Sequence, residues 1–199
     1  RKATSMTLSI ASGETDVPLL HETISANLDA TAARVPDHEA MVDCATGKRR
    51  TYAAFAADVD TLARGFAGSG VGKGDRVGIW APNCAEWTFV QYATAKIGAI
   101  LVNINPAYRT HELQYVLNQA GIKVLVAAPS FKTSDYAGMI EEGRSEVPTL
   151  ERVVLIGRES WDALWAAAEG VSQAELEAIA AGLAPEDPIN IQYTSGTTG

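Results

Sequence analysis

The stretch RVGIWAPNCAEWTFVQYATAKIGAILVN, residues Arg76–Asn103, decides the fold class of this chain of 199 residues. It begins with an apolar run typical of a strand, Arg76–Trp80, and continues with a helical segment, Ala85–Ile97. A second short apolar run, Ala99–Asn103, follows. A strand, a helix and a strand in this order form a right-handed crossover between parallel strands. We therefore expect an α/β fold, a layered structure with a mostly parallel sheet and flanking helices.

The same alternation extends on both sides of this stretch. Before it, the pattern predicts a helix over Leu20–Arg34, a hairpin of Ala40–Asp43 with Arg49–Thr51, and a long helix capped by Thr51 and ended by the glycines that follow Phe66. The long helix buries one face, because its apolar residues recur at three and four positions: Phe55, Val59, Leu62 and Phe66. After it, we expect helices over Thr110–Gln119, Ser130–Gly143, Trp161–Gly170 and Ser172–Gly182, and strands over Val124–Ala127, Arg152–Gly157 and Ile189–Tyr193.

Composition and charge exclude several classes of function. The 16 Lys and Arg against 24 Asp and Glu leave a net charge of -8 without basic clusters, which argues against nucleic-acid binding. No apolar run approaches the roughly 18 residues of a membrane-spanning helix. Cys44 and Cys84 have no metal-binding spacing, so reduced thiols and a cytoplasmic location are expected. We expect residues 1–16 to be a flexible lead-in and residues 17–199 to form one domain.

Two glycine-rich segments compete as phosphate sites. The first, GSGVGKGD at Gly68–Asp75, follows a helix and precedes a strand. A phosphate-binding loop needs the reverse order, so that free N–H groups at a helix N-terminus face the anion. This segment is therefore predicted to be a helix stop and turn, with Lys73 solvated.

The second segment ends the chain, where the strand Ile189–Tyr193 runs into Thr194, Ser195, Gly196, Thr197, Thr198 and Gly199. Open α/β sheets place ligands at the carboxyl ends of their strands, and glycines and hydroxyls can direct several donors at one anion. The spacing is not that of a Walker loop. From the residues alone, a phosphate site and a Ser/Thr-rich surface turn are about equally supported.

The segment YTSGTTG resembles the phosphate-binding signature of the acyl-adenylate-forming (AMP-binding) enzymes. Upstream blocks are similar, in order, to the N-terminal part of fatty-acyl-CoA synthetases: RTYAAFAADVDTLARGF, KGDRVGIWAPNCAEW, ATAKIGAILVNINPAYRTHELQYVL and VLVA. The stretch NPAYRTHELQYVL is most like the medium-chain branch. The resemblance covers most of residues 49–199 and implies that residues 17–199 are the N-terminal part of an AMP-binding domain, incomplete at its C-terminus.

The resemblance also implies a function. A full-length parent would join a fatty acid to AMP from ATP with Mg²⁺ and then to coenzyme A, and Thr194–Gly199 would contact the ATP phosphates. In the family the loop continues with Pro-Lys-Gly, so this sequence ends before that lysine. The resemblance places no catalytic residue and no metal ligand in this chain, and the 199 residues alone are expected to be inactive. Acyl chain length and oligomeric state are not indicated.

Two alternatives from other classes stay open: a truncated, non-catalytic binding module and an NTP-hydrolysing domain. The residues encoded after Gly199 distinguish them, since Pro-Lys-Gly favours the synthetase, Lys-Ser/Thr the hydrolase and a stop codon the module. Other residues are predicted to be structural. The scattered histidines are assigned to the surface, the tryptophans at 80 and 87 mainly to packing, and Lys96 and Asn105 to scaffold at the strand ends.

Overall fold

The computed structural model describes residues 11–14 and 16–194, and its centre is a parallel sheet. The five strands lie in the order β8-β5-β3-β4-β9, and every neighbouring pair is parallel. Their bounds are Arg76–Trp80 for β3, Ile100–Asn103 for β4, Val124–Ala127 for β5, Arg152–Leu155 for β8 and Asn190–Gln192 for β9. The predicted α/β class and parallel sheet are confirmed, and each predicted strand agrees within one or two residues.

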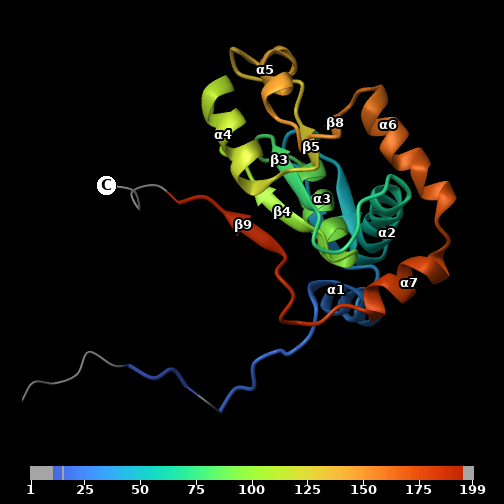
Figure 1. Ribbon diagram of the computed structural model, residues 1–199. Coiled ribbons are helices and arrows are strands. Elements are labelled where there is room, and N and C mark those ends of the chain that lie inside the picture. Colours follow the sequence, from blue (N-terminus) through green and yellow to red (C-terminus); the bar gives the residue numbers. More distant parts are fainter. Residues whose placement is uncertain (1–10, 15, 195–199) are drawn as a thin grey trace, which may run out of the picture.

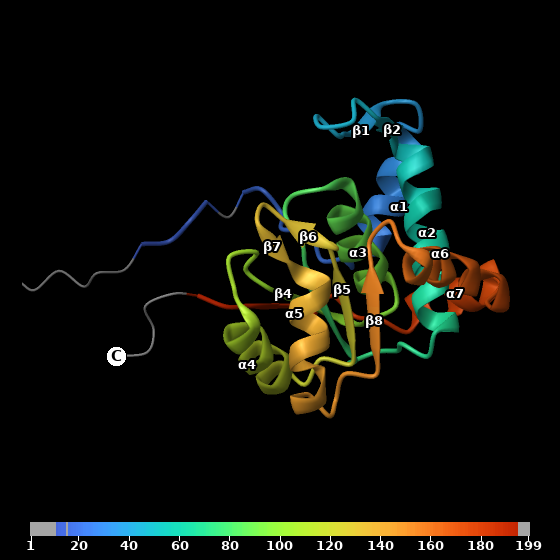
Figure 2. The ribbon, with the colours of Figure 1, turned by 90° about the horizontal axis from the view of Figure 1, so that it is seen from above.

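Helices cover both faces of the sheet, which gives three layers (Figure 2). One face packs against α2 and α3, with α1, α6 and α7 beyond them, and the other packs against α4 and α5. The bounds are Ile24–Arg34 for α1, Tyr52–Gly68 for α2, Ala85–Lys96 for α3, Thr110–Ala120 for α4, Tyr136–Gly143 for α5, Glu159–Ala166 for α6 and Gln173–Ala181 for α7, with short 3-10 turns at Arg144–Glu146 and Ala167–Gly170. Alternating strand residues feed the two cores, because successive side chains point to opposite faces.

Helix α2 illustrates how the sequence specifies an element. Its N-cap, Thr51, accepts a hydrogen bond from the backbone N–H of Ala54 at 3.2 Å. The four apolar residues expected on one face are all buried: Phe55, Val59, Leu62 and Phe66. The cap prediction and the buried-face prediction are therefore both confirmed.

Two predicted helices begin later than expected. The first starts at Ile24 rather than Leu20, because the Thr23 side chain caps it by accepting from the Ala26 N–H. The other starts at Tyr136 rather than Ser130, since Asp135 caps it. The preceding residues form a two-stranded hairpin, β6 (Ser130–Phe131) with β7 (Ser134–Asp135).

A second small hairpin, β1 (Glu39–Val42) with β2 (Arg49–Thr51), is antiparallel and separate from the main sheet. The predicted hairpin is therefore confirmed, and it projects beyond the start of α2 (Figure 2). The lead-in predicted over residues 1–16 lies mostly outside the described residues and stays a prediction. Among the described residues, no helix combines the length and apolar character that a membrane crossing needs.

Candidate functional site at the carboxyl edge of the sheet

The strand order creates a switch point between β3 and β4. From β3 the chain passes through α3 on one face to β4, and from β4 it passes through α4 on the other face to β5, which lies on the opposite side of β3 (Figure 1). Two connections that leave in opposite directions open a crevice at the carboxyl ends of these strands. This is the position at which open α/β sheets bind their ligands.

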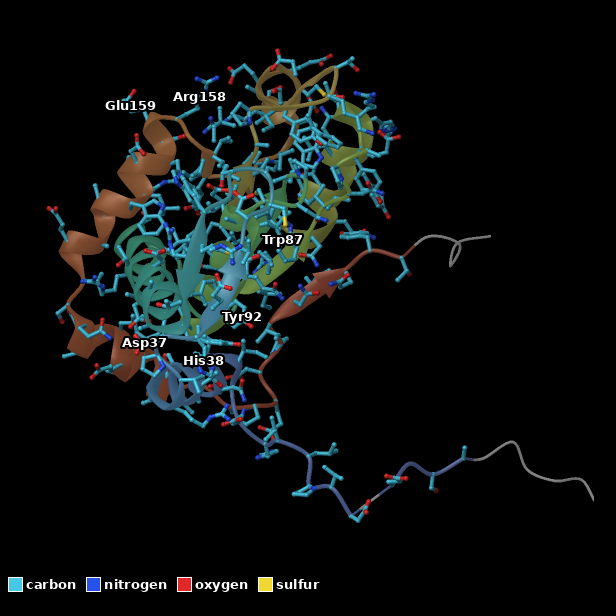
Figure 3. All side chains as sticks on the ribbon, turned by 180° about the vertical axis from the view of Figure 1, so that it is seen from behind. Asp37, His38, Trp87, Tyr92, Arg158 and Glu159 are labelled. Carbon is cyan, nitrogen blue, oxygen red and sulfur yellow. The ribbon has the colours of Figure 1, made fainter. Side chains whose placement is uncertain are left out.

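A cavity of about 440 Å³ occupies this crevice. Residues after β3, residues after β4 and the end of β9 all contribute to its lining. Its polar lining consists largely of four side-chain amides: Asn83, Asn103, Asn105 and Gln192. Its aromatic lining is Trp87, Tyr108 and Tyr193. Trp87 lies near the start of α3 (Figure 3) and also packs against the core, so it combines the structural role predicted for it with a place at the site.

Hydrogen bonds hold the loop after β4 in place. The backbone carbonyl of Asn105 accepts from the indole N–H of Trp80 at 3.1 Å, and its side-chain oxygen accepts from the Ala107 N–H at 2.9 Å. The hydroxyl of Tyr136 donates to the carbonyl of Pro106, while its ring stacks on Trp80 with centroids 3.6 Å apart. These contacts hold this wall of the cavity in place, so Asn105 has the scaffold role that the sequence predicts and also lines the cavity.

The predicted phosphate loop begins where β9 ends. Thr194 is described and exposed, two residues after the end of β9. The other five predicted contacts lie outside the described residues: Ser195, Gly196, Thr197, Thr198 and Gly199. What the structure provides is the position of the loop's entrance, since Gln192 and Tyr193 both line the cavity.

Tyr193 also borders a second, neighbouring cavity of about 320 Å³. That cavity is lined by Tyr108, Tyr115 and His111 among others, so three tyrosines meet beside the loop entrance. Burial, together with the nearby phenols of Tyr115 and Tyr108, raises the pKa of Tyr193. A phenol with a raised pKa stays protonated at neutral pH and remains a hydrogen-bond donor.

The chemistry available at this edge is binding and orientation. None of the described residues lining the 440 Å³ cavity carries a charge, so none of them is a general base or a carboxylate ligand for Mg²⁺. The buried side-chain oxygen of Asn103 has no hydrogen-bond partner among the described residues. A buried acceptor without a partner costs free energy, so it favours a ligand that brings a donor.

The competing glycine-rich segment lies at the opposite, amino edge of the sheet. Gly74 has a φ of +83° and donates from its N–H to the carbonyl of Gly98 at 2.8 Å, immediately before β3. The prediction of a helix stop and turn is confirmed. The prediction that Lys73 is merely solvated is wrong, because its Nζ lies 2.6 Å from the Asp187 carboxylate and so anchors the segment before β9.

The remaining candidates are structural. Among the described residues no cluster of His, Cys, Asp and Glu could hold a metal ion. Lys96 lies on α3 and is buried between carboxylates of α1 and α2, so it joins helices rather than strand ends. Both cysteines are free, and burial raises the pKa of the Cys84 thiol to about 11, which makes it a poor nucleophile at neutral pH.

Sequence reasoning missed most of the residues that line this cavity. Asn103 and Gln192 each stand at or next to the carboxyl end of a parallel strand, which is the one sequence signal that could have identified them. Asn83 follows the carboxyl end of β3 in the loop before α3, so the same rule points to this loop, although not to Asn83 in particular.

Comparison with known proteins identifies relatives over almost the whole chain. Residues 28–199 match the family described as AMP-binding enzyme. The chain is 40% identical over 211 residues to the medium-chain acyl-CoA ligase ACSF2, mitochondrial, of Macaca fascicularis, a match that covers 96% of this chain and 34% of that protein. It is 38% identical over 200 residues to the putative acyl-CoA synthetase YngI of Bacillus subtilis (strain 168), covering 91% of this chain and 36% of that protein.

The fold is also similar to that of a solved structure. The N-terminal domain of FACL13 from Mycobacterium tuberculosis superposes with a TM-score of 0.73 at 27% identity, covering 87% of this chain and 42% of that one. The chain spans about a third of the length of the curated relatives that it matches.

Proposed function

Because this chain belongs to the AMP-binding enzyme family, we propose that it is the N-terminal part of a fatty-acyl-CoA synthetase. The whole enzyme would convert a fatty acid and ATP to an acyl-adenylate and then to acyl-CoA and AMP. Within it, this chain would supply the loop that holds the ATP phosphates. The observation that carries the proposal is that β9 ends beside the switch-point cavity, which Gln192 and Tyr193 line, directly before the sequence Thr194–Gly199.

The residue types indicate which role each part of the proposed site would have. Phosphoryl and adenylyl chemistry depends mainly on positioning and charge stabilisation. The hydroxyls and N–H groups of Thr194–Gly199 would supply donors to the phosphates, and the wall after β4 would exclude water and orient the bound nucleotide. We propose that ATP, Mg²⁺ and coenzyme A are all used by the whole enzyme, with the Mg²⁺ ligands outside the described cavity lining.

We propose a medium-chain fatty acid as the substrate class. The support is that the ACSF2 relatives are named medium-chain acyl-CoA ligases. Activity of the full-length protein on short-, medium- and long-chain acids tests this, and equal rates on all three would contradict it. We also propose a cytoplasmic location, on the ground of the two free thiols. The ACSF2 relatives are called mitochondrial, so cell fractionation is the test.

The decisive experiment removes one donor from the loop of the full-length protein. Thr197→Ala is expected to cost about 1.5–3 kcal/mol of transition-state stabilisation, which is a loss of roughly 10- to 150-fold in kcat/KM for ATP. The assay is fatty-acid-dependent exchange of labelled pyrophosphate into ATP. A matched control is Thr149→Ala, which removes an exposed threonine from the turn before β8. Unchanged kinetics for alanine at both Ser195 and Thr197 would refute the assignment.

A further inference from the structure

The outer strand β9 has a neighbouring strand on one side only. It pairs in parallel with β4, and in the part of the chain that the structure describes no strand lies along its other edge (Figure 1). The carbonyl of Ile189 accepts from the Leu101 N–H of β4 at 3.0 Å. Because the backbone groups of successive residues point to opposite sides of a strand, those of Asn190 and Gln192 point to the free edge. A free edge of this kind can pair with another strand.

A cavity of about 320 Å³, called here the tyrosine cavity, opens at the end of β9. Its lining includes Tyr193 from the strand end, Tyr108 from the loop after β4, and Tyr115 and Val116 of α4. Ile191 and Tyr193 also pack against the core that α4 covers. The free edge and the tyrosine cavity therefore adjoin, so a segment that pairs with β9 has an aromatic hollow beside it for one of its side chains.

Tyr115 separates the tyrosine cavity from a second hollow on the outer side of α4. It lines both the tyrosine cavity and a cavity of about 550 Å³ that also includes Glu146. Its side chain is 57% exposed, and among the described residues it is the one aromatic in the set of exposed large hydrophobic side chains. Tyrosine is enriched at protein interfaces and among the residues that contribute most to binding. The position of Tyr115 is therefore that of an anchor for a polypeptide partner.

The exposed face of α4 carries almost no charge. None of its 11 residues is Lys or Arg, and its one carboxylate, Glu112, accepts from the Arg109 N–H at 3.1 Å within the helix cap. Around Tyr115 this face presents imidazole and amide side chains: His111, Gln114, Asn118 and Gln119. Helix faces that stay in water usually carry charged residues, whereas the centres of protein interfaces are depleted of them. The composition of this face therefore favours contact with protein.

We propose that the free edge of β9, the tyrosine cavity and Tyr115 form one docking surface for the polypeptide that follows Gly199 in the full-length protein. An extended segment of that polypeptide adds a strand along β9, and an apolar side chain beside it fills the tyrosine cavity. This inference rests on the proposed function, in which the chain is the N-terminal part of a longer enzyme. The chain spans about a third of the length of its curated relatives, so ample polypeptide remains to supply the segment.

The covalent connection favours this occupant over a second copy of the protein. Tyr193 already lines the tyrosine cavity, and the sequence reaches Gly199 only six residues later. A segment tethered so close to its docking surface meets it at a high effective concentration, on the order of millimolar for a short flexible linker. A second copy has no such tether and must bind from dilute solution.

Photo-cross-linking in the full-length protein identifies the occupant. Tyr115→p-benzoylphenylalanine places a photoreactive group at the cavity, and mass spectrometry of the illuminated, digested protein locates the cross-link. A mixture of isotope-labelled and unlabelled protein separates links within one molecule from links between two. We expect the α4 peptide to be joined to a peptide encoded after Gly199, with the same isotope in both halves. Mixed isotopes would identify a second copy, and links only to residues before Gly199, or no link, would mean that nothing downstream docks there; each result overturns the proposal.

The matched control carries the same photoreactive group at Glu159. This residue is exposed at the start of α6, which packs on the opposite face of the sheet from α4 (Figure 3). The control should give no link to the downstream peptide that Tyr115 captures. The same link from Glu159 would show that the reaction does not depend on the docking surface and would overturn the proposal.

Hydrogen exchange in the full-length protein tests the strand pairing without a photoreactive group. The amides of Asn190 and Gln192 should exchange at least about 100-fold more slowly than in an unstructured peptide. Tyr115→Ala should speed their exchange about tenfold and leave the amide of Val77 in the central strand unchanged. Unprotected amides at Asn190 and Gln192, or no response to Tyr115→Ala, would overturn the proposal. Fatty-acid-dependent pyrophosphate exchange without the cross-link would refute the docking surface alone, whereas the cross-link without that exchange would refute the proposed function alone.

Discussion

Lys96 is expected to be the largest single electrostatic contribution to the packing of α1, α2 and α3. Its side chain is 4% exposed, and its Nζ lies 2.8 Å and 3.0 Å from the two carboxylate oxygens of Asp29 on α1 and 2.5 Å from Asp60 on α2. Asp29 is half exposed, whereas the Asp60 side chain is 21% exposed and also accepts from the Gln173 amide at 3.0 Å. The perturbation is Lys96→Met, which keeps the aliphatic bulk and removes the charge.

The expected loss in the free energy of unfolding depends on how well each of the two carboxylate partners can be rehydrated. Breaking a buried ion pair costs about 3–5 kcal/mol, because it leaves a buried charge without compensation. Asp29 can rehydrate, so its share is that of a surface pair, up to about 1 kcal/mol. We therefore expect Lys96→Met to lower the free energy of unfolding by about 3 kcal/mol, most of it through Asp60. For a chain of this size that is a fall of roughly 6–12 °C in Tm.

Urea unfolding followed by circular dichroism measures the effect, with Asp29→Asn as the matched control. The control should cost no more than about 1 kcal/mol. The reasoning is refuted if Lys96→Met lies within 1 kcal/mol of the native chain, or if Asp29→Asn is the more damaging change.

The pH dependence of the Lys96 contribution has a definite sign. Burial acts to lower the pKa of Lys96, but the contacts with Asp29 and Asp60 outweigh it, so the pKa is raised. A raised pKa means that the stabilisation is fully present below the unfolded value of about 10.4 and is lost as the pH rises through the folded value. The difference between the native chain and Lys96→Met should therefore be constant from pH 7 to 9 and shrink only above about pH 10.5.

Other predictions concern helix packing, the thiols and the amino edge of the sheet. Gly65→Ala should destabilise the chain by about 1–3 kcal/mol in chemical denaturation, because a Cβ there would lie 2.2 Å from a backbone oxygen of α6. Gly72→Ala, where nothing lies within 4 Å, is the control, and equal effects would contradict this packing argument. At pH 8, iodoacetamide should alkylate Cys44 well before Cys84, because burial raises the pKa of the Cys84 thiol to about 11. Mass spectrometry measures the order of alkylation, and faster reaction at Cys84 would show the reasoning to be wrong. Lys73→Ala should lower the free energy of unfolding by about 0.2–1 kcal/mol, since the side chain of Lys73 in its ion pair with Asp187 is half exposed. The change should leave the ATP affinity of the full-length protein unaltered. A clear loss of ATP binding would instead assign the phosphate site to the glycine-rich segment that contains Lys73.

The local order of apolar runs, caps and glycines is enough to determine the succession of strands and helices in this protein. The runs at Arg76–Trp80 and Val124–Ala127 are buried strands with the predicted bounds, since burial on both faces requires continuous apolar sequence. The Thr51 cap and the glycine-rich helix stop before β3 are equally local, because each depends on a side chain or a backbone angle within a few residues. The entry of β9 into a hydroxyl-rich and glycine-rich loop is likewise readable from the sequence.

Strand order was decided only by the tertiary structure, and the site depends on it. No local pattern places β9 beside β4, or β3 between β4 and β5, because those neighbours are chosen by which faces bury the most apolar surface once all the helices are packed. The amide-lined cavity exists only because that order puts a switch point between β3 and β4, and the same packing brings Lys73 to Asp187 across 114 residues. Pairings over such separations depend on the whole chain, so they cannot be read from any one stretch of it.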